Sequence, residues 1–156
     1  QPLPFADMKD KYAMMNGRGY PDTVNPNSLT PIPNPVTEPD PGKVSQKVSS
    51  RVTATSGQKV LLRLSNLSVT NFYTVTALGL PMKVVGTGAH ILRGPDGTDL
   101  YYDTSSVTLG GGEAADVIID TAGISPGTYF LYTANLNYLS NNTEDYGGMM
   151  TEIVIN

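Results

Sequence analysis

The chain has 156 residues, a formal net charge of −4, a charged fraction of 15% and no cysteine. Its length fits one domain with a sizeable core, and its charge argues against a nucleic-acid-binding surface, which requires clustered basic residues. The lack of cysteine excludes disulfides, thiolate metal sites and cysteine nucleophiles, and no apolar run is long enough to span a membrane.

The N-terminal part of the chain is dominated by turn and proline signals. Residues 1–10 are expected to form a linker or an N-terminal arm, and Gln1 in place of methionine indicates a processed or excised chain. Residues 12–15 predict a short strand that ends at the turn dipeptide Asn16-Gly17. Residues 24–43 contain repeated prolines, which remove backbone donors and fix φ. This stretch is therefore predicted to be a surface insertion, with a docking arm for an adjacent domain or subunit as the alternative.

The rest of the sequence predicts short strands separated by turns. The expected inward residues are Val44, Val48, Val52 and Ala54 in residues 44–55, and Val60, Leu62 and Leu64 in residues 59–67. Further strands are predicted at residues 72–78, 82–85, 100–102, 106–109, 114–120, 128–133 and 149–155. No segment has helical periodicity over three turns. About eight to ten short strands favour an all-β Greek-key sandwich or barrel.

The segment from Gly127 to Met149, GTYFLYTANLNYLSNNTEDYGGM, resembles the copper-ligand segment of cupredoxins. In multicopper oxidases that segment reads Gly-Thr-Trp-x-x-His-Cys-His-x-x-x-His, followed by Gly-Met. The positions that correspond to these copper ligands are Tyr132, Thr133, Ala134, Tyr138 and Met149. Hydroxyl, methyl and phenol groups cannot replace the thiolate and imidazoles of a blue copper site, so the resemblance implies a degenerate site without metal. It also implies that residues 132–138 lie next to Met149.

Other segments are similar to the second cupredoxin domain of multicopper oxidases. Residues 12–23 (YAMMNGRGYPDT) resemble its first strand, and residues 56–68 (SGQKVLLRLSNLS) resemble its segment with Leu-Arg-apolar-x-Asn. Residues 106–120 resemble its apolar-x-Leu-x-Pro-Gly-Glu-x-x-Asp segment, with Asp116 at the aspartate. A histidine that the family often carries is missing at residues 78–80. The resemblance covers residues 11–156, which we expect to form one cupredoxin-like domain.

The resemblance implies a function as well as a fold. The chain is similar to the copper-free middle domain of a three-domain multicopper oxidase, which spaces and packs the copper-bearing domains. We therefore expect no cofactor and no catalysis in this chain, and copper in neighbouring domains that oxidise a substrate and reduce oxygen to water. The expected partners are adjacent cupredoxin domains or subunits, through residues 25–40 and 135–145, and self-association is possible.

The composition leaves a second hypothesis open. Many small polar residues and tyrosines are typical of secreted all-β proteins, so we expect a secreted, periplasmic or cell-surface location. A free-standing extracellular β-sandwich that binds a partner or a glycan, or assembles with copies of itself, would have the same composition. Copper-ligand His-x-His pairs in flanking sequence would distinguish the oxidase hypothesis from this alternative.

Other groups that could carry chemistry are isolated in the sequence. His90 is the only histidine, so it cannot form a metal centre alone, and we expect a hydrogen-bonded loop residue. No Gly-x-Ser-x-Gly elbow accompanies it, which argues against a hydrolase. The carboxylates that could form a weak calcium site are Asp96, Asp99, Asp103 and Glu113, and we expect them to be solvated charges. Glu144 and Asp145 are also expected to be surface charges.

Tyrosines gather in the degenerate copper segment, at Tyr129, Tyr132, Tyr138 and Tyr146. We expect their rings to fill the volume that ligands and metal occupy in the family, because protein cores are densely packed. An aromatic rim for a carbohydrate or a partner is the alternative. The sequence also contains two glycosylation sequons, Asn66-Leu67-Ser68 and Asn141-Asn142-Thr143.

Overall fold

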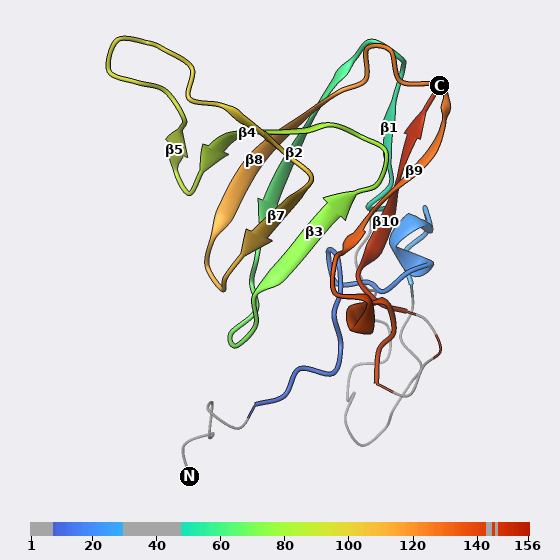
Figure 1. The fold of residues 1–156 in the computed structure, drawn as a ribbon. Helices are drawn as coiled ribbons and strands as arrows, with labels where there is room; N and C mark the ends of the chain where they lie inside the picture. Colours follow the sequence, from blue (N-terminus) through green and yellow to red (C-terminus); the bar gives the residue numbers. More distant parts are fainter. Residues whose placement is uncertain (1–7, 30–47, 143–144, 146) are drawn as a thin grey trace.

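The computed structural model describes residues 8–29, 48–142, 145 and 147–156. In these ranges the chain forms two packed β-sheets (Figure 1). The first sheet has the order β1 (Val52–Ala54), β10 (Met150–Ile155), β9 (Gly127–Thr133), β3 (Tyr73–Ala77) and β7 (Ser106–Leu109). The second has the order β2 (Lys59–Ser65), β8 (Ala114–Asp120), β4 (Met82–Thr87) and β5 (His90–Ile91), and β6 (Tyr102–Thr104) also pairs with β4. The all-β sandwich predicted from the sequence is confirmed.

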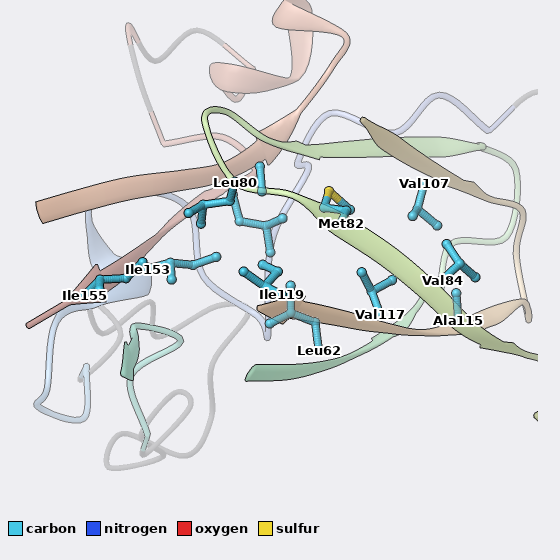
Figure 2. Packing of buried hydrophobic residues seen from close by; sticks show 12 residues of the cluster. Leu62, Leu80, Met82, Val84, Val107, Ala115, Val117, Ile119, Ile153 and Ile155 are labelled. Carbon is cyan, nitrogen blue, oxygen red and sulfur yellow. The ribbon is translucent and has the colours of Figure 1, made fainter. Parts of the chain in front are cut away.

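Apolar side chains from both sheets meet between them, as Figure 2 shows. On β8 the alternation is strict: Ala115, Val117 and Ile119 are buried, and the residues between them face outward. On β10 the inward residues Ile153 and Ile155 are fully buried, at 0% and 1% exposure. Burial of this apolar surface is the main favourable contribution to folding. The period-2 pattern of these strands therefore fixes which face of each sheet covers the core.

Most predicted strands agree with the structure, and β8 and β7 occupy their predicted ranges. The strand predicted at residues 44–55 is wrong in extent, because only Val52–Ala54 pairs in a sheet. Val48 is 71% exposed, and residues 44–47 lie outside the described part of the chain. The Ser50 N–H donates to the Thr23 carbonyl at 2.7 Å, so this stretch bonds to the N-terminal loop instead of a strand.

Residues 12–15 do not form the predicted strand. Met15 and Arg18 form an isolated bridge, with backbone N–H···O distances of 2.9 and 3.1 Å. Asn16 and Gly17 between them have φ of 51° and 78°, as a tight hairpin turn requires. The predicted Asn-Gly turn is therefore confirmed, although no ladder continues from it. The strand β5 was not predicted, because its two residues are both exposed and carry no alternation.

Two short 3₁₀ turns complete the described part, η2 (Asp22–Val24) and η3 (Leu136–Leu139). None of the described segments is a helix with the length and hydropathy to cross a membrane. A long loop between β5 and β6 projects from the sandwich at the upper left of Figure 1. Residues 1–7 and 30–47 include most of the predicted arm and proline-rich insertion, and they lie outside the described residues.

The N-terminal loop is held by one buried cation. Arg18 is 2% exposed, and its guanidinium donates to the carbonyls of Asp22, Asn25 and Asn27 at 3.0, 2.8 and 2.9 Å. Thr23, which is fully buried, donates its hydroxyl to the Met150 carbonyl at 2.7 Å. A planar guanidinium can reach several carbonyls at once, whereas an ammonium cannot. Arg18 therefore shapes the loop that joins the N-terminal segment to β10.

We predict that Arg18→Lys lowers the free energy of unfolding by about 2 kcal/mol, because buried carbonyls lose hydrogen bonds to a charged donor. Urea unfolding followed by circular dichroism measures the change. The matched control is Arg63→Lys, since the Arg63 side chain is 78% exposed and should change stability by less than about 0.5 kcal/mol. Equal effects of the two substitutions would contradict the proposed role of Arg18.

Candidate functional site

The segment that follows β9 folds back onto the start of β10. The Thr133 N–H donates to the Met149 carbonyl at 3.1 Å, and the Met149 N–H donates to the Tyr138 carbonyl at 2.8 Å. The predicted proximity of residues 132–138 to Met149 is confirmed by these bonds. We call the group Thr133, Ala134, Tyr138 and Met149 the loop site.

Local hydrogen bonds explain why this loop turns as it does. The Asn135 side chain caps η3 by accepting from the Asn137 N–H at 3.2 Å, as asparagine commonly does at the start of a helical turn. The Asn141 side chain accepts from the Ala13 N–H at 2.8 Å and donates to the Gly147 carbonyl. The loop is thereby tied to the N-terminal segment on one side and to the start of β10 on the other.

A glycine is also required immediately before Met149, because two backbone segments approach each other closely there. A Cβ built at Gly148 would overlap the Tyr138 carbonyl oxygen and the backbone of Leu139. The Gly148 N–H donates to the Leu139 carbonyl at 3.2 Å, which holds η3 against this position. The glycine of the Gly-Met pair is therefore required by packing of one backbone on another.

The side chains of the five predicted positions do not converge. Thr133 is fully buried and Met149 is 5% exposed, Tyr138 is half-buried, and Ala134 is exposed. Tyr132 alternates with Thr133 along β9, so its side chain lies on the other face of the sheet. The structure brings Thr133, Tyr138 and Met149 together through the backbone and leaves Tyr132 on the outer face.

The donor chemistry of these positions does not fit copper. A blue copper site requires a thiolate and two imidazoles, with a thioether as a weak axial ligand. Thr133 supplies a hydroxyl that already donates to the Asn135 carbonyl at 3.3 Å, and Met149 supplies only the thioether. No group of three His, Cys, Asp or Glu side chains with metal-site geometry exists within the described ranges.

The remaining titratable candidates lie outside the loop site, and four of the carboxylates among them have their own partners. His90 is exposed on β5, in the second sheet. Asp99 pairs with Arg93 at 3.0 Å, Asp103 with Lys83 at 3.7 Å, and Glu113 accepts from the Gly110 N–H at 2.6 Å. The Thr98 hydroxyl and N–H donate to the Asp96 carboxylate and lower its pKa. Asp145 is exposed, and Glu144 and Tyr146 lie outside the described residues.

The structure adds one aromatic residue that the sequence analysis did not select. The rings of Tyr73 and Tyr138 pack edge to face, with centroids 5.1 Å apart and planes at 71°. Burial raises the pKa of Tyr73, a hydrogen bond with the Asn71 side chain lowers it by less, and the charge of Asp10 makes a still smaller contribution that raises it. The available signal was its position beside Phe72 at the start of the strand predicted at residues 72–78. Tyr138 therefore packs against a ring that comes from β3.

A polar hollow of about 300 Å³ opens beside this aromatic pair. Its lining consists of Asp10, Lys11, Ala13, Tyr73, Asn137, Tyr138, Ser140, Asn141 and Asn142. Amide and hydroxyl groups next to aromatic rings can contact a polar ligand with both hydrogen bonds and ring faces. Of the loop-site residues, Tyr138 lines this hollow.

Both sequon asparagines are used structurally. Asn66 is 7% exposed, and its amide donates to the carbonyls of Asn71 and Leu109 at 3.0 and 2.7 Å. Asn141 is 3% exposed and bonds to the N-terminal segment as described above, while Thr143 lies outside the described residues. Their side-chain amides are engaged in the fold and not presented to solvent.

We predict that Gly148→Ala lowers the free energy of unfolding by about 1–3 kcal/mol, because a methyl group would push the backbone of η3 away from β10. Gly127→Ala is the matched control, since its added Cβ would meet its nearest neighbour only at 3.9 Å. Thermal and urea unfolding measure both variants. A Gly148→Ala protein as stable as the control would show that the loop site tolerates separation of these backbones.

We also predict a pH dependence from Tyr73. Its folded-state pKa is raised above 10.0, so the stability it contributes is complete below pH 10 and is lost as pH rises through the raised pKa. The free energy of unfolding should therefore fall less steeply above pH 10 in Tyr73→Phe, which keeps the ring pair, than in the wild type. Burial also raises the pKa of Tyr20, and this effect is present in both the wild type and Tyr73→Phe. The difference between their two stability curves therefore reports on Tyr73. Parallel curves would contradict the assignment.

Comparison with known proteins identifies the fold. The multicopper oxidase mgLAC is similar with a TM-score of 0.58 and 16% identity, over 100% of this chain and 47% of that chain. The blue copper oxidase from Nitrosomonas europaea has a TM-score of 0.53 and 20% identity, over 99% and 46%. The multi-copper oxidase from Pseudomonas thermotolerans has a TM-score of 0.52 and 19% identity, over 67% and 22%. These likenesses show a cupredoxin-like fold, and the chain spans less than half the length of each of these proteins.

The sequence comparison agrees with the structural one. No curated protein matches the chain. The family model for multicopper oxidases matches residues 6–154, which is nearly the whole sequence. The chain belongs to the multicopper oxidase family.

Proposed function

We propose that the chain is a copper-free structural domain of a multicopper oxidase, which spaces and packs the copper-bearing domains. The observation that carries this proposal is the loop site. Its backbone holds Thr133, Tyr138 and Met149 together as a copper loop would, while the side chains there offer hydroxyl, phenol and thioether groups. Such a site keeps the fold of a copper domain and has no thiolate or imidazole for the metal.

In this proposal residues 11–156 form one domain, with residues 1–10 as an arm and residues 24–43 as an insertion. Copper in neighbouring domains would carry out one-electron oxidation of a substrate and reduction of oxygen, as the family implies. The work of this chain would be positioning, in a secreted, periplasmic or cell-surface protein. A contact role for this region is supported by Leu136, the first residue of η3, which is 65% exposed.

A second candidate function has one observation in its favour. The polar hollow beside Tyr73 and Tyr138 combines aromatic rings with the amides of Asn137 and Asn142. A free-standing β-sandwich that binds a glycan or a partner would use such a surface. The two functions differ in whether copper-bearing domains accompany this chain in the natural protein.

The first test determines the complete natural protein by intact mass and sequencing. We expect a mass well above the 16.6 kDa of this chain, with copper-ligand His-x-His pairs in flanking domains. The isolated chain, mixed with Cu²⁺, should show no intense blue absorption, because the thiolate that produces it is missing. A natural protein without copper-bearing domains would refute the spacing role, and a blue band from the chain alone would refute the copper-free role.

The second test concerns the contact surface in the complete protein. We predict that Leu136→Asp lowers oxygen consumption or copper retention by about tenfold, since a charge placed in a packed apolar contact costs on the order of 1–3 kcal/mol. The matched control is Leu78→Asp. Leu78 is 67% exposed, and it follows the end of β3 that lies away from Tyr73 and the loop site. The unfolding of the isolated chain should be unchanged by either variant. Equal rates of the two variants would place the contact elsewhere.

A further inference from the structure

The two asparagines that begin the glycosylation sequons lie inside the fold and not on its surface. Asn66 is 7% exposed in the sequon of residues 66–68, and Asn141 is 3% exposed in the sequon of residues 141–143. An N-glycan is bulky and hydrophilic, so acceptor asparagines belong in surface loops. Both sequons therefore have the sequence of an acceptor and the setting of a core residue.

Asn66 joins the two sheets at one end of the sandwich. It directly follows β2 of the second sheet. Its side-chain amide donates to the carbonyl of Asn71, shortly before β3, at 3.0 Å, and to that of Leu109, the last residue of β7, at 2.7 Å. Its side-chain oxygen accepts from the Ser68 N–H at 2.8 Å. Both amide hydrogens and the oxygen are therefore used within the fold, and β3 and β7 both belong to the first sheet.

The backbone around Asn66 is packed too closely for a sugar. The Asn66 N–H donates to the Glu113 carbonyl at 3.0 Å, and the Gly112 N–H donates to the Asn66 carbonyl at 2.8 Å. A Cβ built at Gly111 would overlap the Ser68 carbonyl oxygen. The β2–β3 loop thus packs directly on the β7–β8 turn. A sugar ring on the Asn66 amide is much larger than a methyl group, so it does not fit while these contacts persist.

Asn141 has a similar role between three segments. Its side-chain oxygen accepts from the Ala13 N–H at 2.8 Å, and its amide donates to the Gly147 carbonyl. The Asn142 N–H beside it donates to the Lys11 carbonyl at 3.0 Å. A glycan on Asn141 would have to enter between the N-terminal segment and residue 147, and these contacts close that space.

The chemistry of N-linked glycosylation conflicts with these bonds. An oligosaccharyltransferase joins the anomeric carbon of a lipid-linked oligosaccharide to the side-chain nitrogen of asparagine. One amide hydrogen leaves as a proton, and the lipid pyrophosphate is the leaving group. At Asn66 both amide hydrogens are donated to carbonyls, so the reaction would leave one of these carbonyls without its partner. A buried carbonyl without a partner loses the free energy of its hydration.

We propose that the local contacts of Asn66 and of Asn141 close both sequons to N-linked glycosylation, so that the unfolded chain is an acceptor and the folded chain is not. The inference goes beyond the proposed function, because it concerns the maturation of the chain and not its contacts with other domains. It implies that the chain matures where this modification is absent, or that it folds before the transferase acts.

The test treats the 156-residue chain with a purified oligosaccharyltransferase and a lipid-linked oligosaccharide, and measures occupancy of each sequon by mass spectrometry of its peptides. The unfolded reference is Val117→Asp, because Val117 is 0% exposed and a charge there should unfold the chain, which circular dichroism checks. We expect at least about tenfold higher occupancy of Asn66 and Asn141 in this variant than in the folded wild type, since modification follows the open population.

The matched control is Asp96→Asn, which creates the sequon Asn-Gly-Thr at residues 96–98. Asp96 is exposed on the projecting loop between β5 and β6. The folded control should be modified at residue 96 and at neither native sequon, which shows that the transferase acts on folded chains where the asparagine is accessible.

Two further variants open one sequon each. Ala13→Pro removes the N–H that bonds to Asn141, and Gly111→Ala pushes the β7–β8 turn away from the loop that follows Asn66. We expect Ala13→Pro to raise the occupancy of Asn141 at least about fivefold with that of Asn66 unchanged, and Gly111→Ala to do the reverse, since local opening is confined to the contacts that each variant removes. Circular dichroism identifies a variant that has unfolded as a whole, and Lys11→Pro or Gly112→Ala then takes its place.

Three results would overturn the proposal. Occupancy of either native sequon in the folded wild type equal to that of residue 96 in the control would show that the fold does not close it. Sequons that stay unmodified in Val117→Asp would show that their sequence, and not the fold, prevents the reaction. Folded variants that raise both occupancies equally would show that the local contacts of Asn66 and Asn141 do not guard them.

Discussion

The fold depends on the close contact between the loop after β9 and the first residues of β10. Thr133 and Tyr138 both bond to the backbone of Met149, and Gly148 allows η3 to approach because it has no side chain. Each unpaired backbone group in this buried region would cost the desolvation of a polar group, so the bonds must form together. Arg18 and Asn141 extend the same network to the N-terminal segment. The loop end is thus held by main-chain bonds that need no metal.

Because main-chain bonds hold this loop, the fold can persist when the side chains at the copper-ligand positions are replaced. A metal site requires a particular side chain at each ligand position, whereas backbone bonds require only that the residue can adopt the conformation. Thr133 fits a fully buried position by bonding to the nearby Asn135 carbonyl. Tyr138 fits by packing its ring against Tyr73. The backbone contacts that hold such a loop are therefore independent of the side chains that would bind a metal.

The sequence predicted the parts of the fold that alternation or turn chemistry determines. β8 was predicted to the residue because its apolar positions alternate without exception, and the Asn16-Gly17 turn was predicted from its dipeptide. Residues 48–51 were mispredicted because the Ser50 N–H and the Ser49 hydroxyl both bond to the Thr23 carbonyl, a contact between distant segments that alternation does not encode.

The loop site shows the same division between local and distant contacts. The Gly-Gly-Met frame predicted that residues 132–138 lie beside Met149. The Tyr73 contact and the outward direction of Tyr132 depend on strand neighbours, which the spacing of motifs does not give.

The position of β10 has a consequence for biosynthesis. It lies between β1 and β9, so that Ile153 pairs with Val52 on one side and with Tyr129 on the other. A ribosome releases residues in order, and β10 is the final strand of this sequence. The first sheet can close only when these last residues have left the exit tunnel, so the apolar faces of β1 and β9 stay exposed to chaperones and to aggregation until translation has passed them.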